Sequence, residues 1–283
     1  MNFSSAFKYP FHNFAKVMSI VLALTIAFAV FSAMILNSHD WTPLFAHLYE
    51  IEAVDPSVDT LEPVSGTTII GIFGLIVVAI ASGFWLSGYS IEVIRAVMRE
   101  DEWMPAVDIS RNVKDGALLF VSSVAYWLLF IALIVVVAVG THLLGGVATL
   151  VLMVFTIVAI CVMGWAYFVG MARFALEGDY RASWEIWKNM RAARVNWRSG
   201  AKLLLYMIAF SIVYGTVRQI ADGIFGGLMG ANLLTGITVS IIIYYIFNLM
   251  QHFSTQVLIA QYASEIGIRG DHYDPEKGKV DSF

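Results

Sequence analysis

Charged residues are scarce in this chain, and their scarcity excludes an ordinary soluble domain. They make up 13% of the 283 residues, whereas about a quarter is usual in soluble globular domains. Between Asp115 and Arg173 there is no Asp, Glu, Lys or Arg. A single bilayer span needs roughly 20 apolar residues, so this stretch holds two spans and a turn. We therefore expect an all-α integral membrane protein.

Motifs of catalysis, metal binding and redox chemistry are also lacking. The single cysteine, Cys161, excludes an intrachain disulfide. The sequence has no H-E-x-x-H metal helix, no P-loop, no Cys-x-x-Cys pair and no dinucleotide fingerprint. We therefore expect no enzymatic activity and no cofactor. The basic residues are spread along the membrane surface, which favours lipid headgroups over nucleic acid as partners.

Apolar runs separated by turn residues predict six transmembrane helices in one polytopic domain over 1–265. The predicted spans lie near 16–37, 67–91, 116–139, 147–172, 200–221 and 237–262. The apolar core of the first is longer than the h-region of a signal peptide, about 7–15 residues, so we expect it to stay uncleaved. The uncharged, glycine-rich segment 223–236 is either a re-entrant loop or a surface loop.

The basic residues predict the orientation of these spans. Of the 17 Lys and Arg residues, all except Arg218 fall on one side of the predicted membrane. Because Lys and Arg resist translocation, we expect that side to be the cytoplasm, with both termini and the tail 266–283 there. The protein would then lie in the cytoplasmic (inner) cell membrane, with the acidic loop 38–66 outside.

The connection 180–197 between the fourth and fifth spans combines apolar residues at three-residue spacing with basic residues among or opposite them. Its basic and aromatic residues include Arg181, Trp184, Trp187, Lys188, Arg191 and Arg194. This pattern predicts an interfacial amphipathic helix, with Trp at the membrane boundary and cations near anionic lipid. Such a helix is either an ordinary membrane anchor or a docking surface for a partner.

Three predicted inward spans end in the same way. Each has an aromatic residue three positions before a glutamate, and the glutamates are Glu92, Glu177 and Glu265. One interpretation is a helical hairpin repeated three times in parallel orientation. The other is chance similarity between short motifs.

The sixth predicted span carries the most polar residues, and these are functional candidates because polar groups are costly in a bilayer. They include Asn248, Gln251, His252, Thr255 and Gln256. A substrate path or a proton site with His252 as the titrating group is one hypothesis. The other is hydrogen bonding between helices.

Several short motifs resemble those of the bacterial and archaeal membrane proteins grouped as domain-of-unknown-function family 4013. The motifs are Phe7–Phe11, Gly88–Arg99 with Pro105 downstream, Asp115–Ala117, and Ala172–Phe174 before the connection rich in Trp and Arg. The resemblance implies a polytopic helical membrane domain and assigns no activity.

Together these patterns favour a non-enzymatic accessory or scaffold subunit. We expect it to act through the lipid bilayer, through other membrane proteins or through a second copy of itself. The alternative is a transporter, permease or lipid-handling protein that uses the polar face of the sixth span.

Overall fold

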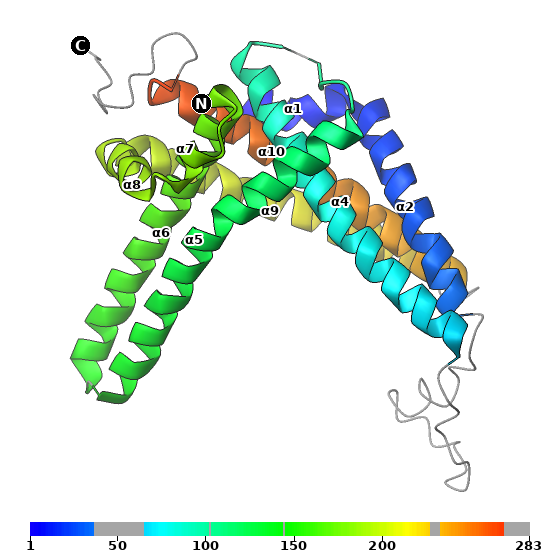
Figure 1. The fold of residues 1–283 in the computed structure, drawn as a ribbon, viewed down its shortest axis with the longest axis horizontal. Helices are drawn as coiled ribbons and strands as arrows, with labels where there is room; N and C mark the ends of the chain where they lie inside the picture. Colours follow the sequence, from blue (N-terminus) through cyan, green and yellow to red (C-terminus); the bar gives the residue numbers. More distant parts are fainter. Residues whose placement is uncertain (37–64, 102, 144, 227–232, 269–283) are drawn as a thin grey trace, which may run out of the picture. The chain divides into compact units, whose positions relative to one another are not determined.

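The computed structural model is helical and contains no strand in the residues that it describes, which are 1–36, 65–101, 103–143, 145–226 and 233–268 (Figure 1). Contacts divide the chain into two units, Met18–Gly83 and the remainder, Met1–Val17 with Phe84–Phe283. Most of the predicted loop 38–66 and of the predicted tail 266–283 lies outside the described residues, as do positions 227–232 of the glycine-rich segment. The prediction of one domain over 1–265 stays a prediction.

Long apolar helices dominate the chain. The helices are α1 (Phe3–His12), α2 (Phe14–Leu36), α4 (Gly66–Met98), α5 (Ile109–Leu143), α6 (Gly146–Glu177), α7 (Arg181–Trp184), α8 (Ile186–Val195), α9 (Trp197–Gly226) and α10 (Leu233–Glu265). In the described part of the chain, five are long and apolar enough to cross a membrane, namely α2, α4, α5, α6 and α9. They contain or closely match the first five predicted spans, so the chain is a multi-pass membrane protein.

The sixth predicted span, 237–262, lies inside α10. That helix has 33 residues, about 50 Å at 1.5 Å per residue. It is not one of the five helices that are long and apolar enough to cross a membrane, a set drawn from the described residues alone. The six-span arrangement therefore stays a prediction, and so does the threefold hairpin.

In the smaller unit, α2 packs closely against the part of α4 that precedes Phe84. A Cβ atom added at Gly74 would lie 2.2 Å from the ring of Phe31, and one added at Gly71 would lie 2.7 Å from Cγ1 of Ile35. Small residues allow such close approach between helices in a membrane. The two glycines therefore set the contact between these helices.

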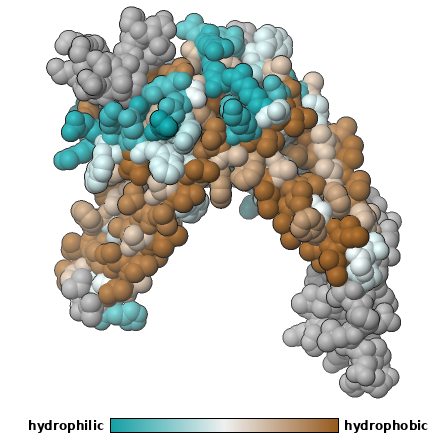
Figure 2. Space-filling view, viewed as in Figure 1, coloured by the Kyte–Doolittle hydropathy of each residue, from teal (hydrophilic) through white to brown (hydrophobic). Residues whose placement is uncertain are grey.

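One hydrophobic cluster in the core of the larger unit lies toward the helix ends that bear the charged residues. Its members come from four helices, and they are Ile91 and Ile94 of α4, Leu119 of α5, Met171, Phe174 and Ala175 of α6, and Ile259 and Ala260 of α10. The opposite halves of α5 and α6 expose their apolar side chains, among them Val135, Val136 and Phe155. Figure 2 shows hydrophobic residues along these two helices and hydrophilic residues gathered where α7 and α8 lie.

Two glycines bring α4 and α5 into backbone contact. A Cβ atom at Gly88 would lie 1.7 Å from the carbonyl oxygen of Asn112, and one at Gly116 would lie 1.7 Å from that of Phe84. No side chain fits between backbones at that separation. Both glycines belong to the motifs on which the family resemblance rests, and close helix packing is the physical role of both.

Helix α1 was not predicted from the sequence. The side chain of its N-cap residue, Asn2, accepts a hydrogen bond from the backbone N–H of Ser5, and Pro10 lies inside its last turn. An aromatic stripe fixes α1 on α9. The ring of Phe3 lies 4.6 Å from that of Phe210, and the ring of Phe7 lies 5.5 Å from that of Tyr214.

Candidate functional site

A fully engaged arginine holds α7 and α8 on the α5–α6 hairpin. Arg173, near the end of α6, has a side chain that is only 2% exposed. Its Nε donates to Glu177 at 3.0 Å, one terminal nitrogen, Nη1, donates to Oδ1 of Asn189 at 3.0 Å, and the other, Nη2, lies 2.6 Å from Oε2 of Glu185. Nη1 also donates to the carbonyl oxygen of Ala182 at 3.3 Å. A buried cation is stable only when paired and hydrogen-bonded in this way.

Asn189 continues this network into the hairpin. It is fully buried, and its amide nitrogen donates to the hydroxyl of Tyr126 at 3.1 Å and to the carbonyl oxygens of Ala182 and Ser183 at 3.1 and 3.3 Å. The Tyr126 hydroxyl in turn donates to the carbonyl of Ser183 at 3.0 Å. One side chain therefore ties α8 to α7 and to α5.

Two glycines at the end of α6 make this arrangement possible. At Gly178 the backbone adopts the left-handed conformation, with φ of 69°, and its N–H donates to the carbonyl of Phe174, so α6 ends and the chain reverses. At Gly170 an added Cβ atom would lie 3.0 Å from the amide nitrogen of Asn189 and 3.3 Å from the hydroxyl of Tyr126. The network thus fits against bare backbone at that position.

The predicted amphipathic segment 180–197 has a different form from the one expected. The helix breaks at Glu185, whose φ and ψ of −74° and 57° are not helical. Met190 and Ala193 pack inward against the hairpin, whereas Trp184 and Trp187 are 49% and 82% exposed. The stripe seen in the sequence is therefore divided between two faces.

The exposed surface of this segment is aromatic and basic. We define the outer face as the exposed aromatic and basic side chains of α7, α8 and the first turn of α9. They are Arg181, Trp184, Trp187, Lys188, Arg191, Arg194, Trp197 and Arg198. Partial burial raises the pKa of the Glu185 carboxyl beneath it, but hydrogen bonds from Lys188 and Arg173 outweigh burial and hold that pKa below its ordinary value.

The three glutamates of the proposed repeat all form ion pairs at helix ends. Glu92 pairs with Arg95 at 2.6 Å and with Arg111 at 2.9 Å. Glu177 pairs with Arg173, as described above, and Glu265 lies 3.5 Å from Nζ of Lys202. Local pairing explains Glu92 and Glu177, whereas Glu265 pairs with Lys202 of a different helix, and the repeat itself stays a prediction.

A second buried arginine secures α4 to α6. The Nε of Arg95 donates to the carbonyl oxygen of Ala175 at 2.7 Å. That carbonyl lies in the last turn of α6, where backbone oxygens lack partners within the helix. Arg95 therefore supplies a hydrogen bond to a carbonyl oxygen at the C-terminal end of α6. It also places positive charge where the dipole of that helix favours it.

The polar residues predicted on one face of α10 have several environments. The Nε2 of His252 lies 2.6 Å from the hydroxyl of Ser90, and the amide of Gln251 donates to the hydroxyl of Ser211 at 3.0 Å. The hydroxyl of Thr255 donates to the carbonyl of Gln251 within the helix. Asn248 is exposed, and the remaining polar residue, Gln256, is buried with an Oε1 atom that has no hydrogen-bond partner among the described residues.

Sequence reasoning missed the centre of the polar network. Asn189 is a polar residue on the inner face of α8, between Ile186 and Ala193, and that position was its only signal in the sequence. On α9, the guanidinium of Arg218 lies 4.4 Å from the ring centroid of Tyr244, a cation–π contact that the sequence did not suggest. The described residues contain no group of three or more His, Cys, Asp or Glu side chains that could hold a metal ion.

The described helices and their boundary network define a multi-pass helical membrane protein. The chain belongs to the family described as "Protein of unknown function (DUF4013)", whose model matches residues 71–221. This confirms the resemblance, and the match includes Gly88, Gly116 and Arg173. No curated protein and no solved structure matches the chain.

Proposed function

We propose that this protein is a non-enzymatic membrane scaffold or accessory subunit that acts through its outer face on protein partners or lipids. The observation that carries this proposal is the contrast between the two sides of α7 and α8. The inner side is held by Arg173 and Asn189 through hydrogen bonds and ion pairs. The outer side exposes tryptophans and arginines, residue types enriched in binding hot spots.

A rigid support makes such a face effective, because little conformational entropy is lost when a preorganised surface binds. The same face suits a membrane surface, since Trp favours the boundary and each Lys or Arg near anionic lipid contributes about 1 kcal/mol. In the proposed orientation the outer face and both termini lie in the cytoplasm. Basic residues on that side support this orientation.

Charge reversal on the outer face tests the proposal. Arg191→Glu with Arg194→Glu should abolish co-purification, in mild detergent, of a partner that the wild-type chain retains in stoichiometric amount. Arg99→Glu with Lys114→Glu is the matched control, because it makes the same charge change at two exposed residues, one just after α4 and one near the start of α5. The proposal fails if the wild-type chain retains neither protein nor lipid and instead moves a solute into liposomes.

The second candidate is a transporter, permease or lipid-handling protein that uses α10. The observation that favours it is Gln256, a buried polar residue with an unpartnered Oε1 atom. Its neighbours Gln251 and His252 pair with side chains of other helices, which favours a structural role. Solute uptake that is lost in Gln256→Leu but kept in Asn248→Leu would establish this second function instead.

A further inference from the structure

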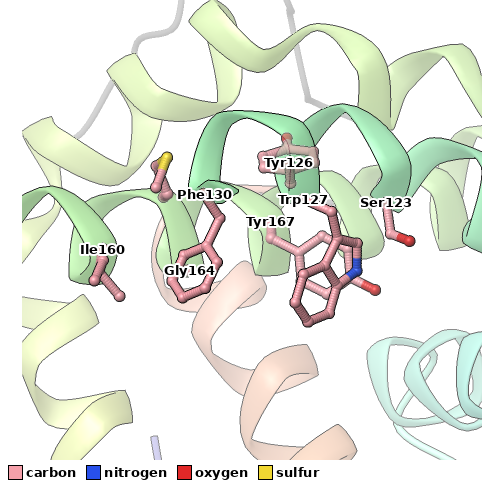
Figure 3. A pocket seen from close by; sticks show the side chains of 8 residues that line it. Ser123, Tyr126, Trp127, Phe130, Ile160, Gly164 and Tyr167 are labelled. Atoms are coloured by element: carbon pink, nitrogen blue, oxygen red, sulfur yellow. The ribbon is translucent and has the colours of Figure 1, made fainter. Parts of the chain in front are cut away.

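A pocket of about 280 Å³ opens between α5 and α6, beside the contact that fixes α8 on the hairpin (Figure 3). Tyr126 and Tyr167 belong both to its lining and to the cluster in which Ala193 of α8 is buried. The pocket is thus formed by two apolar helices that are long enough to cross a membrane. Its natural surroundings are lipid.

The lining changes from polar to apolar along the hairpin. Ser123, Trp127 and Tyr167 place hydroxyl groups and an indole N–H toward one end, and Phe130 and Ile160 line the other (Figure 3). Phe130 follows Ser123 by seven residues and Ile160 precedes Tyr167 by seven, about 10 Å along each helix. Because the helices are antiparallel, both steps lead away from α8.

Polarity decreases along the pocket in the same direction as along a membrane lipid, from the polar headgroup to the apolar chains. Tyr167 lies six residues before Arg173, about 9 Å along the helix, so the polar end lies near the charged boundary and the apolar end nearer the bilayer centre. The volume is just below the 300–1,000 Å³ usual for pockets that enclose whole small molecules. It therefore fits a segment of one hydrocarbon chain rather than an entire lipid.

The positive charge near the polar end of the pocket favours a lipid with an anionic headgroup. Helix α8 is seated on the hairpin by its inner face and exposes Lys188, Arg191 and Arg194. Such a group of cations at the level of the headgroups attracts anionic lipid. We propose that the pocket binds one acyl chain of an anionic phospholipid whose headgroup lies against the basic residues of α8. This inference rests on the proposed function and names the lipid class for it.

Gly164 provides a substitution that fills the pocket. It lies in the lining, and a Cβ atom added there meets nothing within 4 Å. Leucine is also a better helix former than glycine, so Gly164→Leu should fold and occupy the space of the chain. Gly215→Leu is the matched control, because Gly215 also lies inside a long apolar helix with nothing within 4 Å of an added Cβ.

The experiment offers the purified full chain equal amounts of dioleoylphosphatidylglycerol and dioleoylphosphatidylcholine in mixed micelles and counts retained lipids by native mass spectrometry. We expect one phosphatidylglycerol per chain, preferred over phosphatidylcholine by at least about tenfold, which corresponds to 1.4 kcal/mol. Gly164→Leu should retain at least about tenfold less of it, whereas Gly215→Leu should match the wild type.

Equal retention of the two lipids by the wild-type chain would overturn the inference, as would equal retention by the two leucine variants. Displacement of lipid by a protein segment that crosslinks to Phe130 would also overturn it. If Gly164→Leu does not fold, Ile160→Trp fills the apolar end instead, and the wild-type comparison still decides. Retention of lipid and capture of a protein partner are separate measurements, so failure of this inference can be distinguished from failure of the proposed function.

Discussion

Replacement of Asn189 by alanine should release α8 from the α5–α6 hairpin. The side chain accepts one hydrogen bond from Arg173 and donates to Tyr126 and to the carbonyls of Ala182 and Ser183. A hydrogen bond to a charged group contributes about 1.5–3 kcal/mol and a neutral one about 1 kcal/mol. The two carbonyls keep other donors, Arg173 and Tyr126, so the expected loss is about 3 kcal/mol rather than the sum of all four bonds.

Hydrogen–deuterium exchange in detergent measures this loss locally. Because each 1.4 kcal/mol is a factor of ten, exchange of the backbone amides of 186–195 should accelerate roughly a hundredfold. The end of α10 should keep its protection. Asn196→Ala is the matched control, since Asn196 makes one hydrogen bond to the carbonyl of Ala192 in the same helix, and its loss should accelerate exchange no more than about fivefold.

The reasoning is refuted if Asn189→Ala changes exchange in 186–195 by less than about fivefold, the range allowed to the control. It is also refuted if the acceleration extends equally to α10, because the defect would then be global. The first result would mean that apolar packing around Ala193, rather than the polar network, holds α8 in place, and the second that Asn189 stabilises the whole unit rather than α8 alone.

Two further predictions concern the helix crossing and the acid sensitivity of the network. Gly88→Ala or Gly116→Ala should abolish recovery of folded, monodisperse protein in detergent, because each added Cβ meets a backbone carbonyl at 1.7 Å, whereas Gly83→Ala, with nothing within 4 Å, should be tolerated. The pKa of Glu185 is lower in the folded chain than its ordinary value, so its ion pairs stabilise the fold above that ordinary value and are lost as pH falls through the lowered pKa. The melting temperature should therefore fall as the pH is lowered from 6 to about 3, across the ordinary value of 4.5 and toward the lowered pKa, and it should fall less in Glu185→Gln; equal slopes would contradict the assignment.

The membrane helices were predictable because one physical signal dominates them. A charge-free stretch such as 116–172 cannot be solvated by water, so the positions of α5 and α6 follow from composition. Helix α1 gave no such signal, because it is short, contains Pro10 and carries Lys8. Its position depends on aromatic contacts with Phe210 and Tyr214, residues more than 200 positions away from Phe3 and Phe7.

The three-residue spacing of apolar residues in 180–197 does not mark one face of α8, for a geometric reason. A three-residue spacing advances about 300° in an α-helix, so successive members drift by about 60°. Over the nine residues from Trp184 to Ala193 the drift reaches about 180°, which places these two side chains on opposite faces even in an unbroken helix. The inner face instead follows the steps of three and four residues from Ile186 through Asn189 and Met190 to Ala193.

The site itself depends on contacts that sequence order does not reveal. Arg173 was visible as a boundary cation, but its burial follows from the reversal at Gly178 and from Asn189, 16 residues later. His252 and Ser90 come together across 162 positions. The sequence identified the polar residues of α10 but carried no information on the partners of His252 and Gln251.

The placement of the core agrees with the forces available at a membrane. Within hydrocarbon, apolar helices gain little from association, because lipid chains solvate them as well as other side chains do. At the boundary, water restores the hydrophobic effect and leaves buried polar groups in need of partners. Stability in the larger unit is accordingly concentrated around Arg95, Arg173 and the cluster of Ile91 and Phe174. The apolar surfaces of α5 and α6 are thereby left for contact with lipid. The outer face of α7 and α8 is held in place by contacts on the inner side of these helices, and these contacts do not require a bound ligand.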